Sequence, residues 1–267
     1  MAIINRTPDS FFDKGATFAL DRAVAAALTA AADGADWVDI GGVPFGRGDS
    51  VSLAEEIDRV VPVIAAIHAR SDVVISVDTT NAEVARLSIE AGASVINDTS
   101  GFSDPAMAGI VAASTATLVV THSNGVPRSE PQSPKYDDVT GEVVAYLRGR
   151  VAQAEAAGIP RDRLVADPGH DLNKNTMHTL EITRRLHEVV AIGLPTLAAV
   201  SNKDFIGEAI NREQGQRQSG SLAAAVICIM NGARIVRMHD VPAAVDAVRL
   251  TEAVLGFRQP AFARHNV

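Results

Sequence analysis

Polar and ionisable residues follow eight short apolar segments of the chain, each at the point where the segment ends. They are Asn5, Asp39, Asp78, Asn97 with Asp98, His122, Asp167, Ser201 followed by Lys203, and Arg237 with His239. Two carboxylates, an amide and an ammonium in this set together accept and donate hydrogen bonds, as the edge of a flat, nitrogen-rich heterocycle requires. These four are Asp78, Asp167, Asn97 and Lys203. The sequence therefore predicts a pocket for an amino-pyrimidine-like ring.

Arg237 and His239 stand two residues apart on one extended segment, so their side chains point to the same side. Together with Asn5 they can hold an anionic group such as a phosphate or a metal-bound diphosphate. No spacing of cysteines and histidines suits zinc. The sequence thus predicts an anion site beside the heterocycle pocket.

Short β-rich segments alternate with helical patterns along the whole chain, which is typical of βαβ units and a parallel sheet. Strands are predicted at residues 2–5, 37–40, 73–78, 94–98, 117–122, 164–167, 196–201 and 234–239. Helices are predicted within 21–35, where Gly34 stands near the C-terminus, and at about 53–69, 82–91, 105–113, 141–157, 176–190, 219–231 and 242–256.

Eight such pairs match the size of a (β/α)8 TIM barrel, an α/β fold of ~250 residues. In a barrel all the polar strand ends converge on one mouth, where catalytic groups of such folds sit. A doubly wound open sheet is the alternative, and it would spread them along an edge. No linker composition divides residues 1–267, so we predict a single domain.

The net charge of −8 disfavours a general nucleic-acid binder, because little of the surface would neutralise backbone phosphates. The chain has one cysteine, Cys228, in an apolar run, which excludes an internal disulfide and favours a core position in a reducing compartment. Apolar runs are shorter than a membrane span and no signal peptide pattern is present. A cytoplasmic protein with small-molecule partners and no membrane partner is expected.

Seven segments together resemble the dihydropteroate synthase family, in order and over almost the whole chain. They are NRTPDSFFDKG (5–15), DIGG (39–42), ISVDT (75–79), AGASVINDTSG (91–101), DPG (167–169), SNKDFIG (201–207) and RMHDV (237–241). The resemblance implies a pterin-binding (β/α)8 barrel. It also implies a transferase of folate biosynthesis that joins 4-aminobenzoate to a dihydropterin methyl diphosphate and releases diphosphate.

The resemblance also assigns roles to single residues. Catalysis at the pterin pocket would fall to Asp78, Asp167 and Lys203. Substrate binding would fall to Asn97, Asp39, Arg237 and His239. Asn5 matches the residue near Mg²⁺, so Mg²⁺ is the expected cofactor and a homodimer the expected assembly.

The sequence departs from the family in the loops expected to hold the second substrate. DIGG is followed by VPFGRG (43–48) where Glu-Ser-Thr-Arg-Pro-Gly is usual, and Asp204 stands where a hydroxyl is usual. The DPG segment continues as HDLNKN where Ile-Gly-Phe-Gly-Lys-Thr is common. Lys174 in that segment is predicted to line a solvated loop, and His122 is left open between core and site. We expect the loop at 43–48 no longer to clamp aminobenzoate and diphosphate, and Asp204 to repel an anionic acceptor.

Three functions therefore stay open. The first is a dihydropteroate synthase with weak activity or an altered amine acceptor. The second is a catalytically silent pterin-binding paralogue, similar to the divergent second paralogue of actinobacteria. The third, a methyl-tetrahydrofolate-binding methyltransferase domain, is disfavoured by the TPDSF motif after the first segment.

Overall fold

The computed structural model describes residues 1–6, 19–44, 49–123 and 134–265. Within these ranges, eight short strands run parallel to their neighbours. They are β1 (Ala2–Asn5), β2 (Trp37–Gly41), β3 (Val74–Asp78), β4 (Val95–Asp98), β5 (Thr117–Thr121), β6 (Leu164–Asp167), β7 (Leu197–Ala198) and β8 (Ile235–Val236). Their order in space follows their order in the sequence.

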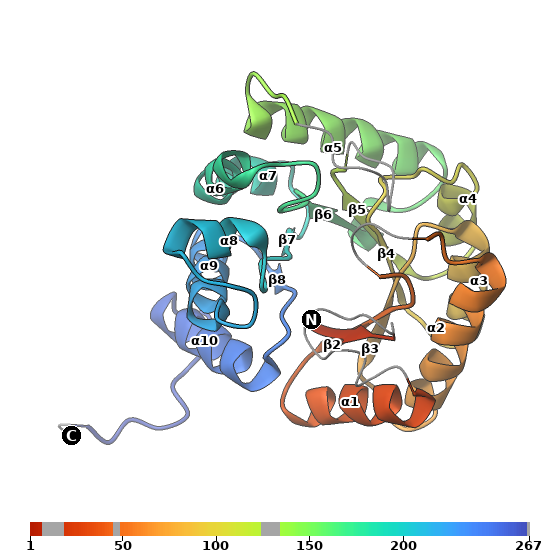
Figure 1. Cartoon of the computed structure of the whole chain (residues 1–267), viewed down its shortest axis with the longest axis horizontal. Helices are drawn as coiled ribbons and strands as arrows, with labels where there is room; N and C mark the ends of the chain where they lie inside the picture. The colour runs from red at the N-terminus through yellow and green to blue at the C-terminus, as the bar shows by residue number, and fades with distance from the viewer. Residues whose placement is uncertain (7–18, 45–48, 124–133, 266–267) are drawn as a thin grey trace.

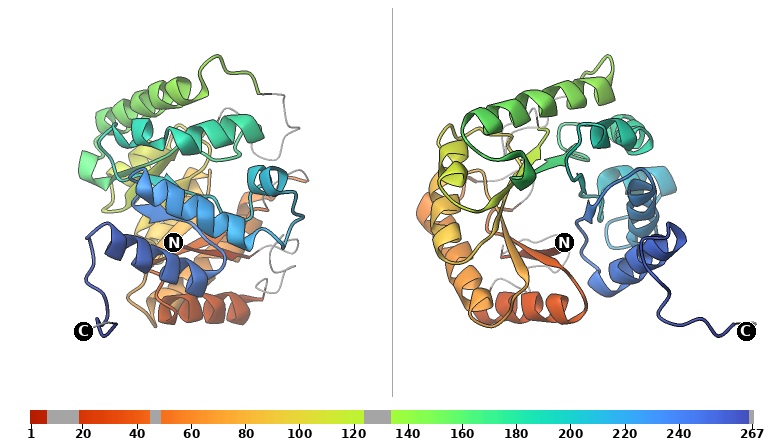
Figure 2. Two further views of the ribbon diagram at one scale, coloured as in Figure 1. Left: turned by 90° about the vertical axis from the view of Figure 1, so that its left-hand side faces the viewer. Right: turned by 180° about the vertical axis from the view of Figure 1, so that it is seen from behind.

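The strands close into a ring. β1 to β6 form one sheet and β7 pairs with β8. Parallel bridges from Ala166 to Thr196 and from Ala2 to Met238 join the two sheets at both edges. Backbone hydrogen bonds support these joints, among them Met238 N–H to the Met1 carbonyl at 2.9 Å. The predicted (β/α)8 barrel is confirmed, the open-sheet alternative is wrong, and Figures 1 and 2 show the helices arranged outside the ring of strands.

The helices follow the strands in the alternation that the sequence predicted. They are α1 (Leu20–Ala32), α2 (Leu53–His68), α3 (Ala82–Glu90), α4 (Met107–Ala112), α5 (Val139–Ala156), α6 (Thr176–Arg184), α7 (Leu186–Val190), α8 (Asp204–Ile210), α9 (Gln218–Met230) and α10 (Val241–Val254), with a 3-10 turn η1 (Arg161–Arg163) before β6. Side-chain caps start several of them, because Ser, Asn and Asp oxygens accept from otherwise unpaired first-turn amides. Asn81 does so for α3 and Asp240 for α10. None of the helices in the described ranges is long and apolar enough to cross a bilayer.

Two of the sequence expectations need correction. The helix predicted over 176–190 is two helices, because Arg185 leaves the helical conformation with ψ 20°. The strands predicted over 196–201 and 234–239 are regular over two residues each. After the first of these segments, Asn202 takes a left-handed conformation with φ 58°, and the chain turns into α8, a helix that was not predicted.

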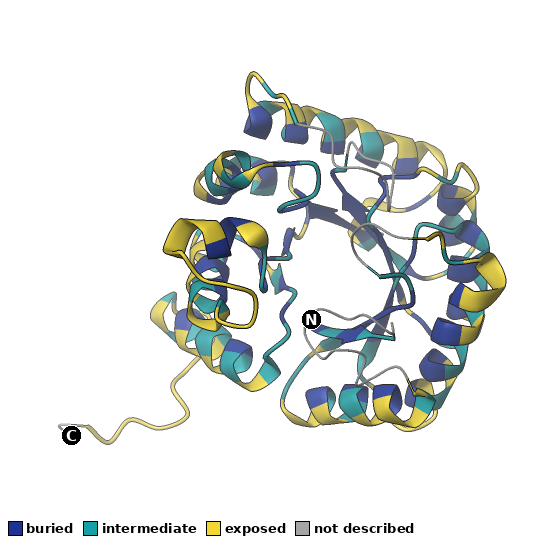
Figure 3. Cartoon of the chain, in the orientation of Figure 1, coloured by how far each residue is buried: buried dark blue, intermediate teal, exposed yellow. Residues whose placement is uncertain are grey.

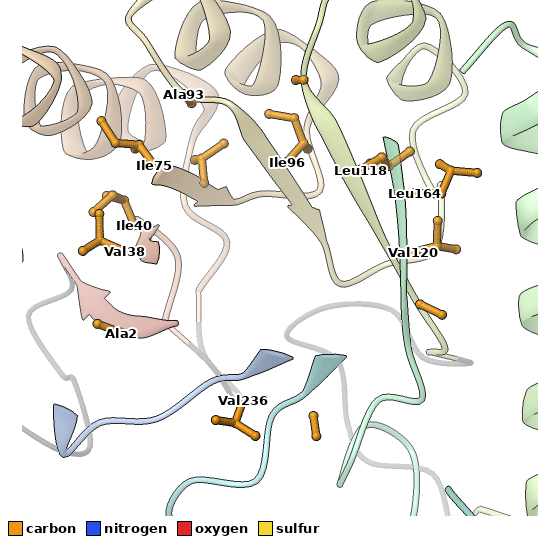
Figure 4. Packing of buried hydrophobic residues seen from close by; sticks show 14 of the residues in the cluster. Ala2, Val38, Ile40, Ile75, Ala93, Ile96, Leu118, Val120, Leu164 and Val236 are labelled. Carbon is orange, nitrogen blue, oxygen red and sulfur yellow. The ribbon is translucent and has the colours of Figure 1, made fainter. Parts of the chain in front are cut away.

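Apolar side chains fill both faces of the strand ring. The larger cluster lies between the strands and the helices, and Figure 4 shows its members Ile40, Ile75 and Ile96. Figure 3 shows the same division, with buried residues on the strands and exposed residues on the outer faces of the helices. Cys228 is fully buried in this cluster, and burial raises the pKa of its thiol to about 12.

A second, smaller cluster packs inside the ring. Its buried members are Val95, Val119, Val165 and Leu197. Because side chains alternate along a strand, Val95 shares its side with Asn97, and Val165 shares its side with Asp167. We name these four side chains the barrel plug. It closes the barrel below the polar strand ends and gives them a dry floor.

Leu197→Ala should lower the free energy of unfolding by about 2–5 kcal/mol, because it leaves a cavity among the buried side chains of the plug. Urea denaturation measures this. Met177→Ala, at a side chain that is 70% exposed, is the control and should change stability by less than about 0.5 kcal/mol. Equal losses for both variants would contradict the assignment of the plug.

Candidate active site at the barrel mouth

Arg237 ties three strands together at the centre of the mouth. Its Nε donates to Asp39 Oδ2 at 2.6 Å and its Nη2 donates to Asp78 Oδ2 at 3.2 Å. Asp39 lies in the middle of the buried part of β2, and Arg237 follows β8 directly. The pair closes the barrel electrostatically at the point where the sequence expected an anion-binding arginine.

The Asp39 carboxylate is completely buried, and protein donors surround it. Besides Arg237, it accepts from Ser76 Oγ at 2.6 Å and from Asn97 Nδ2 at 3.1 Å. Such a carboxylate orients its donors, since its oxygens already hold strong partners.

The Asp39 carboxylate fixes the orientation of the Asn97 side-chain amide. Because a carboxylate only accepts, the amide nitrogen of Asn97 must face Asp39 and its carbonyl oxygen must face away. That oxygen is buried, and no donor in the described part of the chain reaches it. The site therefore presents one oriented, unsatisfied acceptor, which is what a ring N–H or amino group needs.

Asp78 lies beside Asn97 at the ends of β3 and β4. Its side chain is 27% exposed, so it reaches the open part of the mouth. Burial raises the pKa of Asp78 to about 7, and Asp39, Glu56 and Asp98 add to the rise while Arg237 opposes it. Near neutral pH this carboxyl group therefore both accepts and donates protons in hydrogen bonds.

Asp167 ends β6 and is 4% exposed. Its Oδ1 accepts from Gly169 N at 2.7 Å, and burial raises its pKa against the attraction of Lys203. Gly169 has φ 68°, and a Cβ there would lie 2.1 Å from the His122 carbonyl oxygen. The DPG turn thus requires glycine to aim Asp167.

Lys203 stands between the turn after β7 and α8, with extended backbone angles. Burial lowers the pKa of its ammonium, while Asp171, Asp167 and Asp78 raise it. The charged groups of four strand ends therefore act on one small region. The structure brings Asp78, Asn97, Asp167 and Lys203 of the predicted heterocycle set into one region, together with Arg237 of the predicted anion site and with Asp39.

His239 and Asn5 flank this group. Ser201 Oγ lies 2.8 Å from His239 Nδ1 and also accepts from the His239 amide, so it fixes the ring. Asn5 is paired in register with Gly41 at the carboxyl ends of β1 and β2. A Cβ on Gly41 would lie 3.3 Å from Asn5 Oδ1.

The prediction for Lys174 is wrong. Lys174 is buried, and its ammonium lies 2.9 Å from His122 Nδ1 and donates to the carbonyls of Gly169 and Leu172 at 2.9 Å. Burial lowers the pKa of Lys174 to about 7 and that of His122 to about 3, so His122 is neutral and accepts. Lys174 and His122 thus support the DPG turn, since the ammonium that contacts His122 also donates to the Gly169 carbonyl. Its one sequence signal is a lysine five residues after that turn.

Asp204 also differs from expectation. Its side chain is 80% exposed, and its Oδ1 accepts from Arg217 Nη1 at 2.8 Å. A neighbouring cation therefore offsets the negative charge expected to repel an anionic acceptor. The expectation for the loop at 43–48 concerns residues 45–48, which lie outside the described residues.

A closed (β/α)8 barrel with this donor and acceptor set at its mouth defines the class of pterin-binding barrels. The pterin binding enzyme family matches residues 1–239, and the chain belongs to it.

Named relatives extend the match over nearly the whole chain. "Inactive dihydropteroate synthase 2" of Mycobacterium leprae is 43% identical over 266 residues, covering 97% of this chain and 91% of the relative. "Dihydropteroate synthase" of Escherichia coli is 41% identical over 260 residues, covering 97% and 92%. The structure of the Xanthomonas albilineans dihydropteroate synthase with 4-aminobenzoic acid superposes with a TM-score of 0.89 at 40% identity, covering 96% and 92%.

Asp78→Asn should alter stability in a pH-dependent way. Asp78 takes up its proton near pH 7 when folded, against an ordinary value of 3.8, so ionisation destabilises the fold. Wild-type stability from this group is present below about pH 4 and is lost as pH rises through about 7. The variant lacks this loss, so its stability relative to wild type should rise over that range by on the order of 1 kcal/mol or more.

Urea denaturation at pH 4.5, 6 and 8 measures the difference. Asp204→Asn is the matched control, because its carboxylate is exposed. A difference for Asp78→Asn that stays constant across the three pH values would contradict the assignment.

Proposed function

We propose that the barrel mouth binds a dihydropterin and that the chain is a dihydropteroate synthase-like transferase with weak activity toward 4-aminobenzoate. The observation that carries this proposal is the oriented, unsatisfied Asn97 oxygen, in register with Asp78 at the carboxyl ends of β3 and β4. An amino-pyrimidine edge offers N–H donors to these acceptors, and Lys203 donates to a ring nitrogen or carbonyl. Asp39 acts through Asn97 and Arg237, which it orients.

The proposed reaction breaks the bond between the pterin methylene carbon and the diphosphate oxygen, and the electron pair leaves with diphosphate. The arylamine nitrogen then bonds to the methylene carbon and loses a proton. Arg237 and His239 stand where they can offset charge on the leaving diphosphate, and the carboxylates stabilise positive charge at the methylene. No covalent bond to the protein is needed.

Asn5 would supply an amide oxygen to Mg²⁺. In the described residues no group of three His, Cys, Asp or Glu side chains could hold a metal by itself. A single oxygen ligand suits Mg²⁺, which keeps waters and is usually shared with substrate phosphates. When bound, Mg²⁺ would neutralise diphosphate charge and make it a better leaving group.

A silent pterin-binding protein is the second candidate, favoured by the relative from M. leprae that is named inactive. Weak turnover is expected because VPFGRG replaces the usual hydroxyl donors at 43–48. One lost oriented donor costs roughly 10²-fold in rate. Since the charge of Arg217 offsets that of Asp204, we attribute most of the expected loss of rate to the sequence change at 43–48.

Calorimetric titration with dihydropterin methyl diphosphate and Mg²⁺ should give binding in wild type. Asp167→Asn should weaken it about 10- to 100-fold, because a charge-assisted hydrogen bond is lost. Asp204→Asn, at an exposed carboxylate, is the control, and its affinity should stay within about twofold of wild type. Absence of binding in wild type would refute both candidates.

Diphosphate release with and without 4-aminobenzoate separates the two candidates. We expect slow, aminobenzoate-dependent release, which rises when Glu-Ser-Thr-Arg-Pro-Gly is grafted at 43–48 together with Asp204→Ser. Binding without any release, before or after the graft, would leave the silent protein as the answer. A family-typical wild-type rate that the graft does not change would refute the loop argument.

We also propose a homodimer that uses the outer faces of α9 and α10, which pack against each other. Ile227 and Met230 on α9 are 48% and 56% exposed, and Leu250 and Val254 on α10 are 68% and 72% exposed. Exposed apolar side chains gathered on neighbouring helices favour association. A location in a reducing cytoplasm likewise stays a prediction.

Ile227→Glu with Met230→Lys should convert a dimer to a monomer in sedimentation equilibrium. Met177→Glu, at a methionine on α6 that is 70% exposed, should leave the mass unchanged. A monomeric wild type, or a dimer that survives the double change, would contradict this surface.

A further inference from the structure

The loop after β6 carries a carboxylate that the proposed function has not used. Asp171 has φ 64°, in the left-handed region that favours glycine, and it stands where the family pattern commonly has glycine. Asp and Asn tolerate this conformation better than other residues with a side chain. An aspartate in this conformation has a backbone cost that glycine would not have, so we expect its side chain to make contacts that offset it.

That side chain reaches the first turn of α8. Asp171 Oδ2 accepts from Phe205 N at 3.3 Å, and the Asp204 amide and the Thr179 side chain also hydrogen-bond to the carboxylate. The Asp171 amide in turn donates to Thr179 Oγ1 at 3.3 Å. α6 and α8 pack against each other beside this contact. Asp171 therefore joins the loop after β6 to the start of the helix that Lys203 precedes.

Lys203 is the second partner. Three carboxylates attract its ammonium, and Asp171 exerts the strongest attraction, ahead of Asp167 and Asp78. Arg237 repels it, and Lys174 adds to this repulsion only below about pH 7, where its own amine is charged. His170, also near, is fully buried and neutral, since burial lowers its pKa to about 3. Without Asp171, only Asp167 and Asp78 would offset burial and the repulsion by Arg237.

We propose that Asp171 is a positioning residue: its carboxylate fixes the first turn of α8 and keeps the Lys203 ammonium charged and held at the edge of the pocket. The ligand consequence rests on the proposed function, because it takes the pocket to bind a pterin. Lys203 then keeps its proton, and can donate to the ligand, up to a higher pH than a buried amine without this partner. A glycine at this position cannot supply that charge.

Lys203 protonation is measurable without any ligand. Protein labelled with ¹³C at lysine Cε is titrated by NMR, and Lys203→Arg assigns the signal. Asp171→Asn and Asp171→Gly should each lower the pKa of Lys203 by about one unit or more. Both residues tolerate the left-handed backbone, and glycine relieves it, so at least one variant keeps the fold. Asp204→Asn, whose carboxylate pairs with Arg217, is the control and should shift it less. An unchanged Lys203 pKa in a folded Asp171 variant overturns the proposal.

Pterin titration at pH 7 and pH 9.5 tests the ligand consequence. The Asp171 variants should bind within about twofold of wild type at pH 7 and about tenfold more weakly at pH 9.5. Identical pH profiles for wild type and variants, with a shifted Lys203 pKa, overturn the use of this charge in binding. If wild type binds no pterin at either pH, the proposed function fails, while the NMR titration still decides the part played by Asp171.

Discussion

The buried ion pair between Asp39 and Arg237 is the interaction on which the mouth of this barrel depends. It joins residues 198 positions apart, on β2 and after β8, across the closure of the ring. Removing one partner of such a pair leaves an uncompensated buried charge, at a cost of about 3–5 kcal/mol. The same Asp39 orients Asn97, and the same Arg237 restrains Asp78. Fold and pocket therefore share one network.

A closed barrel also brings like charges close together at its mouth. Convergent strand ends place several carboxylates within a small dry volume, and burial raises the pKa of Asp78 and of Asp167. Arg237 and Lys203 keep this cluster stable, and the barrel plug keeps water from entering below. Hydrogen bonds made by buried groups of this kind are electrostatically stronger than the same bonds in water.

Sequence alone predicted most of the architecture, because strand and helix periods differ and each polar strand end follows an apolar run. It also predicted Asp78, Asn97, Asp167 and Lys203 as one set. It failed at Lys174 and Asp204, since nothing in a linear pattern tells whether a charged side chain turns inward to a histidine or outward to an arginine. It missed α8 as well, because that helix is seven residues long and starts without a side-chain cap.

This network explains where in the chain the sequence differs from the family pattern. Asp39, Asp78, Asn97 and Arg237 each hold another member, so a change in one leaves a charge or a donor buried without a partner. Asp204 stands at the start of α8, where its side chain is 80% exposed and pairs with Arg217. Connections tolerate change without loss of the fold. The departures of this sequence from the family pattern accordingly fall outside the interlocked strand ends, at which Asp39, Asp78, Asn97 and Arg237 are all present.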